Sequence, residues 1–77
     1  MKILFFGRLS ETIGREIEFD LPAHGCTVAE LRAALAKTHD GLAAESVRAC
    51  IDHEIAPESA LVLPNQEIAF IPPLSGG

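Results

Sequence analysis

Residues 67–77 read Glu67-Ile68-Ala69-Phe70-Ile71-Pro72-Pro73-Leu74-Ser75-Gly76-Gly77. The first five predict a β-strand that is apolar on both faces, and the two prolines end it because neither can donate to a neighbouring strand. Residues 72–77 could reach roughly 20 Å if extended. Prolines stiffen the base of this segment, and two glycines leave its tip without side chains. We therefore expect a last strand followed by a protruding, flexible C-terminal tail.

The rest of the chain predicts an α+β fold. Short apolar or alternating runs predict strands over residues 2–6, 15–21, 47–52 and 54–56. One main helix is expected to begin at Thr27, which can form a capping box with Glu30, and Gly41 can close it. The helix has one apolar stripe, formed by Val28, Leu31, Ala34 and Leu35. This order predicts a mixed sheet covered on one face by the helix.

The first and last strands are apolar on both faces, whereas the second has a polar face. That polar face consists of Glu16, Glu18 and Asp20, which we interpret as solubilising charges and not as paired catalytic carboxylates. A single helix cannot cover both faces of the two apolar strands. Either loops fold over the second face, or it is a surface that binds a partner. In the second case Phe6 and Ile71 lie on this open face, close to the start of the tail.

Composition narrows the classes of function. At 77 residues, with 48% apolar and 22% charged residues, the chain predicts a single domain over residues 1–77. The net charge of −5 and the lack of a Lys/Arg cluster argue against nucleic acid and anionic membranes as ligands. The sequence has no stretch apolar enough for a signal peptide or membrane span, and only two cysteines. We expect a cytoplasmic protein.

Metal binding is not favoured by the sequence. His24 and Cys26 lie two residues apart, but a closed zinc site needs four ligands. The other candidates are scattered, namely His39, Cys50 and His53. We expect no metal site, and we expect Cys50 to pack as a small hydrophobic residue.

The chemistry suggested by the tail is that of its terminal carboxylate. A carboxylate is a poor electrophile, so a reaction at Gly77 requires another protein to activate it, most simply as an acyl-adenylate made from ATP. This chain has neither the phosphate-binding loop GxxxxGK[ST] nor GxGxxG, and we expect it to bind no cofactor stably. Once activated, the unhindered glycyl carbonyl could accept sulfide and become a thiocarboxylate.

Three segments together resemble the small subunit of molybdopterin synthase, in the sulfur-carrier family that it shares with the thiamin-pathway carrier. They are Lys2-Ile3-Leu4-Phe5-Phe6-Gly7, Thr27-Val28-Ala29-Glu30-Leu31, and the ending from Glu67 to Gly77. The Pro-Pro-x-[Ser/Thr]-Gly-Gly ending resembles the molybdopterin branch more than thiamin-pathway carriers, which usually lack the Pro-Pro.

This resemblance implies a ubiquitin-like β-grasp fold and a set of partners. An adenylating enzyme would activate Gly77, a sulfur donor would convert it to the thiocarboxylate, and the tail residues Pro72, Pro73, Leu74, Ser75 and Gly76 would enter the large synthase subunit of a heterotetramer. Sulfur would then pass to cyclic pyranopterin monophosphate. By the same resemblance, Phe6 and Ile71 would contact the partner.

The resemblance has departures, and two other functions stay open. Family members often have Val-Asn where this chain has Ile51-Asp52, and an Asp-Gly turn where it has Asn65-Gln66. A ubiquitin-like protein modifier, or an interaction domain in which the terminal Gly-Gly is incidental, would also fit the general features.

Overall fold

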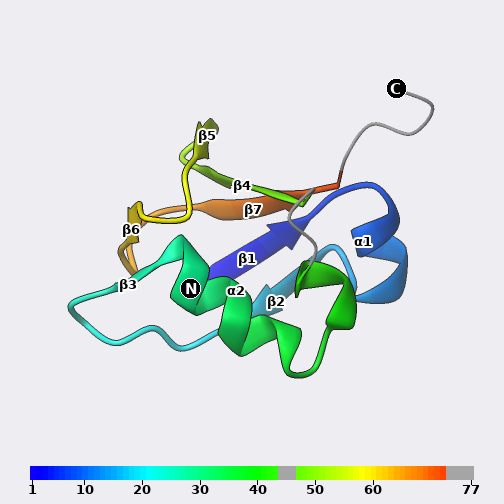
Figure 1. Ribbon diagram of the computed structural model, residues 1–77, viewed down its shortest axis with the longest axis horizontal. Helices are drawn as coiled ribbons and strands as arrows, with labels where there is room; N and C mark the ends of the chain where they lie inside the picture. The colour runs from blue at the N-terminus through cyan, green and yellow to red at the C-terminus, as the bar shows by residue number, and fades with distance from the viewer. Residues whose placement is uncertain (44–46, 73–77) are drawn as a thin grey trace.

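The computed structural model describes residues 1–43 and 47–72 of the chain. Within these ranges, five strands form one sheet in the order β2-β1-β7-β4-β5. Their bounds are β1 Lys2–Phe5, β2 Glu16–Glu18, β4 Arg48–Ile51, β5 Glu54–Ala56 and β7 Ile68–Ile71. β1 and β7 are parallel, and the other neighbouring pairs are antiparallel. The sheet is therefore mixed, with the two strands that are apolar on both faces inside it (Figure 1).

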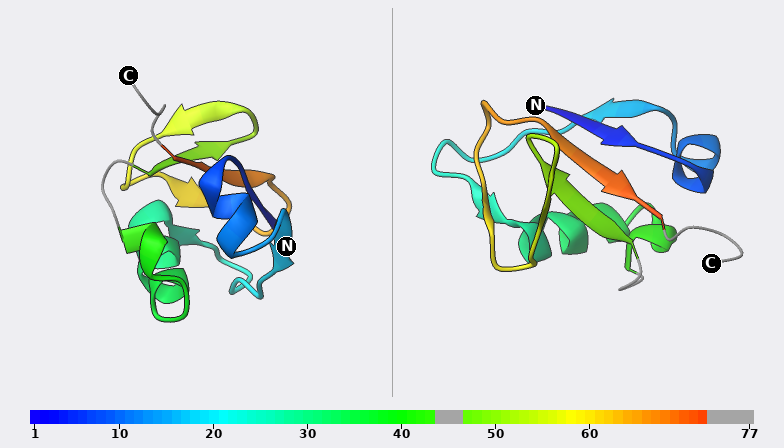
Figure 2. Two further views of the ribbon diagram at one scale, coloured as in Figure 1. Left: turned by 90° about the vertical axis from the view of Figure 1, so that its right-hand side faces the viewer. Right: turned by 90° about the horizontal axis from the view of Figure 1, so that it is seen from above.

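Helix α2, Val28–Ala36, packs on one face of this sheet (Figure 2). The predicted capping box is present: the Thr27 side chain accepts a hydrogen bond from the Glu30 amide at 3.1 Å, and Glu30 Oε1 accepts one from the Thr27 amide at 2.8 Å. The bond from the Thr27 amide, and a second from the Thr27 hydroxyl to Glu30 Oε1 at 3.2 Å, lower the pKa of the Glu30 carboxyl because they favour its charged form. The sequence therefore predicted the start of this helix correctly.

The end of the helix differs from the prediction. α2 stops at Ala36, and Gly41 lies inside a separate 3₁₀-helix, η1, Asp40–Ala43. The amides of Thr38 and His39 both donate to the Leu35 carbonyl, so the chain tightens and turns before Gly41 is reached. Leu42 lies in η1, directly after this turn, and its side chain is fully buried.

Three other elements complete the fold. α1, Arg8–Thr12, fills the predicted connection between the first two strands and buries Leu9. β3, Cys26–Thr27, pairs with β6, Leu61–Val62, in a two-stranded sheet that the sequence did not indicate. β2 ends at Glu18, so the strand predicted to Leu21 is shorter than expected.

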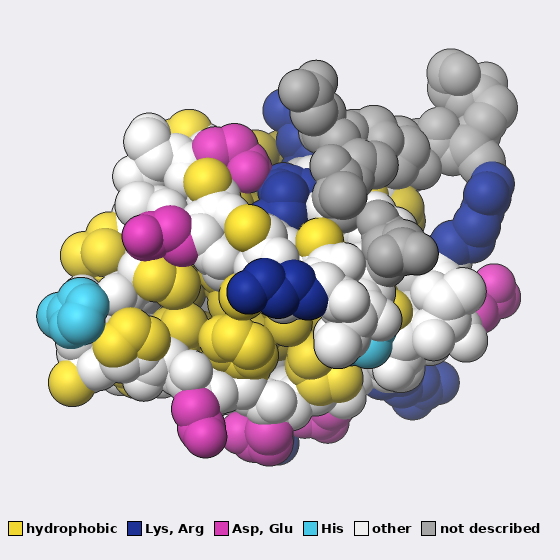
Figure 3. Space-filling view, turned by 60° about the horizontal axis from the view of Figure 1, so that its bottom comes forward, with side chains coloured by type: hydrophobic (Ala, Val, Ile, Leu, Met, Phe, Trp, Pro, Cys, Tyr) yellow, Lys and Arg dark blue, Asp and Glu magenta, His cyan; other side chains and the backbone are white. Residues whose placement is uncertain are grey.

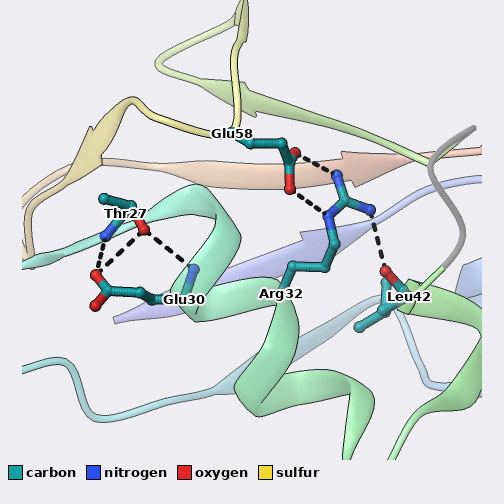
Figure 4. Close-up of polar contacts among 5 residues, drawn as sticks. All are labelled: Thr27, Glu30, Arg32, Leu42 and Glu58. Atoms are coloured by element: carbon teal, nitrogen blue, oxygen red, sulfur yellow. Dashed lines mark hydrogen bonds and ion pairs between the residues drawn. The ribbon is translucent and has the colours of Figure 1, made fainter.

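The core lies between α2 and the sheet. The buried side chains that share this space include Ile3, Phe5, Val28, Leu31, Leu35, Leu42, Ile68 and Phe70. Arg32 closes one side of it (Figure 4). Its guanidinium lies 5.6 Å from the centre of the Phe70 ring, donates two hydrogen bonds to Glu58 at 2.8 and 2.9 Å, and donates a third to the Leu42 carbonyl at 3.0 Å. Arg32 thus joins α2, the segment before β6, and η1.

Candidate functional site

The face of the sheet opposite α2 carries an apolar patch. Strand register places five side chains in one row across this face, since directly paired residues point the same way: Glu16, Leu4, Ala69, Cys50 and Ile55. The other row, with Ile3, Ile68 and Ile51, points toward the helix. We call the first surface the open face.

The open face exposes large apolar side chains, with the charged residues Arg48, which pairs with Ile71, and Glu16, which pairs with Leu4, beside them. Ile55 is 67% exposed, Phe6 49% and Ile71 36%. Phe6 and Ile71 line a shallow depression of about 300 Å³, together with Leu4, Cys50, His53, Glu67 and Ala69. The two strands that are apolar on both faces are central in the sheet, but among the described residues no loop covers Phe6 and Ile71. Binding of a partner on this face stays a prediction.

The predicted tail begins beside this face. Pro72 follows directly after Ile71 and is half-buried. It packs against Gly7, because a β-carbon at Gly7 would lie 2.7 Å from Pro72 Cγ. Gly7 has φ +59°, and Ser10 donates hydrogen bonds to its carbonyl from both backbone and side chain. The corner between β1 and α1 thus supports the base of the tail.

The far rim of the open face is built by the two segments where the sequence departs from the family pattern. Asp52 has φ +49° in the β4–β5 turn. Its carboxylate accepts a hydrogen bond from the Glu67 amide at 3.0 Å and one from the Gln66 side chain at 3.5 Å. Gln66 in turn accepts one from the Leu63 amide at 2.8 Å. The two segments that differ from the family pattern are therefore hydrogen-bonded to each other, and they join the β4–β5 turn to the turn before β7.

The structure brings together only some of the predicted site residues. Phe6 and Ile71 lie at one end of the open face, and Pro72 follows Ile71 and packs against Gly7. The remaining predicted site residues, Pro73, Leu74, Ser75, Gly76 and Gly77, lie outside the described residues. Sequence reasoning missed Ile55, although a tight turn at residues 52–53 would have placed it opposite Cys50 and so on this face.

The described residues hold no group of three or more His, Cys, Asp or Glu side chains arranged for a metal. Cys26 is also a weak candidate for a ligand, because burial and the nearby Glu30 carboxylate raise the pKa of its thiol. Within residues 1–43 and 47–72, no helix has the length and hydropathy needed to cross a membrane.

Comparisons with known structures show which fold this chain has. SAMP1 from Haloferax volcanii superposes with a TM-score of 0.78 at 24% identity, covering 99% of this chain and 97% of that one. A putative molybdopterin converting factor, subunit 1, from Pyrococcus furiosus gives a TM-score of 0.78 at 20% identity, with 95% of each chain covered. Together with the mixed sheet and its helix, these likenesses show a ubiquitin-like β-grasp fold of the α+β class.

The family follows from the sequence match. The model of the ThiS family matches residues 3–77, which is nearly the whole chain. The protein therefore belongs to the ThiS family, the sulfur-carrier family to which the molybdopterin synthase small subunit and the thiamin-pathway carrier belong.

Proposed function

We propose that this protein is the sulfur-carrier subunit of a molybdopterin synthase, and that the C-terminal carboxylate of Gly77 carries the sulfur. The observation that supports this most strongly is the accessible apolar open face beside Ile71 and Pro72, where the Pro-Pro-Leu-Ser-Gly-Gly ending begins. A partner that accepts sulfur from the tail must hold the carrier close to the point where the tail leaves the fold. A docking surface next to Ile71 and Pro72 meets this requirement.

The loading reaction needs two other proteins. An adenylating enzyme joins the Gly77 carboxylate to the α-phosphate of ATP, and pyrophosphate leaves. A persulfide donor, with a thiol reductant, then supplies sulfide to the glycyl carbonyl, and AMP leaves with the carboxylate oxygen. The product is a thiocarboxylate, which is a soft nucleophile.

Unloading takes place in the large synthase subunit. The tail, with glycine at its last two positions, enters a channel too narrow for a β-carbon, and the thiocarboxylate sulfur passes to cyclic pyranopterin monophosphate. Water then hydrolyses the acyl group and restores the Gly77 carboxylate. Two such transfers build the dithiolene of molybdopterin, so the carrier is consumed and regenerated as a cosubstrate.

The unloading step can be tested in a single turnover. Thiocarboxylated protein is mixed with the large subunit and cyclic pyranopterin monophosphate, and both pterin and protein are followed by mass spectrometry. We expect the pterin to gain sulfur while the protein returns to its unloaded mass. If the protein keeps its sulfur with a synthase that works with its own carrier, the molybdopterin role is wrong.

Two alternatives predict different outcomes. A thiamin-pathway carrier would load sulfur equally well but would pass it to a thiazole-forming enzyme and not to the pterin. The structural likeness to a small archaeal modifier protein favours a second candidate, a ubiquitin-like modifier. That function predicts isopeptide-linked products, visible as a ladder of larger species in lysates probed for this chain.

A further inference from the structure

A second surface lies on the helix side of the molecule, away from the open face. It is a groove of about 500 Å³ between α2 and the segment that continues β2, residues 19–22. Its apolar lining includes Phe19, Leu21, Ala34 and Leu61. Leu61 is 53% exposed and adds a large apolar side chain to this lining. Figure 3 faces this side and shows apolar side chains gathered along it, with acidic side chains around them and a Lys or Arg side chain lying across their middle.

The groove borders the free edge of the five-stranded sheet. β2 is the outermost strand on this side, and it pairs only with β1 among the described strands. Alternate residues of an edge strand direct their backbone N–H and C=O groups outward, where an extended segment can pair with them. β2 itself has three residues, and the hydrogen bonds of Phe5 with Arg15 and of Met1 with Phe19 extend the paired segment to residues 15–19. Glu16 and Glu18 therefore direct their backbone groups outward at this edge.

Strand geometry couples this edge to the groove. Ile17 pairs directly with the buried Ile3, so Ile17 and Phe19 point to the helix side. A segment added beside β2 would direct every second side chain to the same side, and therefore into the groove against α2. Its other side chains would lie beside Glu16 and Glu18 on the opposite side of the sheet.

Charge indicates the chemistry of the occupant. The charged groups that line the groove are carboxylates, Asp20 and Glu30, and among the described residues no Lys or Arg lines it. Glu18 on the strand edge is also exposed, although it lies 3.6 Å from the Met1 nitrogen. A second copy of this chain would oppose these acidic edges to each other, which destabilises strand pairing. A basic segment would be attracted instead.

We propose that the β2 edge and this groove bind an extended segment of a partner protein in which apolar residues alternate with Lys or Arg. Backbone pairing with the edge formed by residues 16–19 supplies affinity, and the apolar side chains that enter the groove set the register. The groove is lined by neither Phe6 nor Ile71, so a partner bound here leaves that end of the open face free.

The proposal is tested with a synthetic peptide, acetyl-Lys-Val-Lys-Val-Lys-Val-Lys-amide, titrated into the ¹⁵N-labelled full chain. We expect the largest amide shifts at residues 16–21 and 28–34, with little change at residues 68–71. A peptide of the same composition with its valines in one block should bind at least about ten-fold more weakly, because it cannot point alternate side chains into the groove. An alternating Glu-Val peptide should not bind.

Adjacent positions on α2 provide a matched pair of variants. Ala34 lines the groove, whereas Ala33 is exposed and does not. Arginine is a good helix former, so Ala34→Arg and Ala33→Arg should both fold, and both change the net charge equally. We expect Ala34→Arg to weaken the peptide about ten-fold or more and Ala33→Arg less than about two-fold. Equal affinity for both variants, equal binding of the block peptide, or shifts centred on residues 68–71 would overturn the proposal.

Discussion

Replacing Phe6 by Ala should weaken docking of the partner on the open face without unfolding the protein. The Phe6 side chain is 49% exposed. If a partner buries that half of a roughly 200 Å² aromatic surface, about 100 Å² leaves water, worth about 2.5 kcal/mol at ~25 cal/mol per Å². This corresponds to about 60-fold in affinity. Ordering costs on association reduce the gain, so we expect a loss of between about 10-fold and 60-fold.

The assay is calorimetric titration of the large synthase subunit with native and variant protein, together with thermal unfolding of each. Leu61→Ala is the matched control, because Leu61 is 53% exposed but lies on the helix side. It removes a similar exposed apolar surface and should leave the affinity unchanged. The large subunit does not dock on Phe6 if Phe6→Ala binds it within about two-fold of the native protein, or if Leu61→Ala weakens binding as much as Phe6→Ala does.

Three further predictions concern the tail, the helix cap and the rim of the open face. Gly76→Val should fold and accept sulfur but fail to form molybdopterin, because a β-carbon blocks the channel; normal pterin output would remove the channel from the account. Thr27→Val should cost about 1 kcal/mol in urea unfolding at neutral pH, because it removes the capping hydrogen bond. The Thr27 hydroxyl also donates to Glu30 Oε1, and this bond lowers the pKa of Glu30 in addition to the larger effect of the Thr27 amide, which valine keeps. The contribution of the hydroxyl bond is present above the usual Glu pKa and is lost as the pH falls through the lowered value, so the gap between native and variant should narrow without closing in acid; a gap that is constant with pH would contradict this. Asp52→Asn should keep the hydrogen bond from the Glu67 amide and cost under about 0.5 kcal/mol, whereas Asp52→Ala should cost about 1–2 kcal/mol through the lost bond and the positive φ; equal costs in urea unfolding would show that the bond contributes nothing.

Local chemistry explains which parts of the fold could be predicted from the sequence. The start of α2 is set by Thr27 and Glu30, which lie three residues apart and satisfy each other's amides. The last strand ends at Ile71 because proline follows it. Both features depend on neighbours along the chain, so the sequence shows them directly.

The features that were missed depend on contacts between distant segments. Leu61 and Val62 form a strand only because Thr27 and Cys26 lie opposite them, and two residues are too few to produce a pattern. The helix ends before Gly41 because Leu42 is drawn into the core.

The same reason explains the gaps in the predicted site. Phe6 and Ile71 were identified because their strands are apolar on both faces. Ile55 was missed because its strand has only three residues, and its place on the open face depends on pairing with Cys50. The bond between Asp52 and the Glu67 amide joins two turns that the sequence presents as unrelated.

The central claim is that the last carbon of the chain accepts sulfur, and intact-mass spectrometry tests it most directly. The protein is incubated with an adenylating enzyme, ATP, a persulfide donor and a thiol reductant. We predict a gain of about 16 Da, the replacement of one oxygen by sulfur, located by fragmentation at Gly77 and absent without ATP. An unchanged mass, in a system that loads its own carrier under the same conditions, would contradict the account.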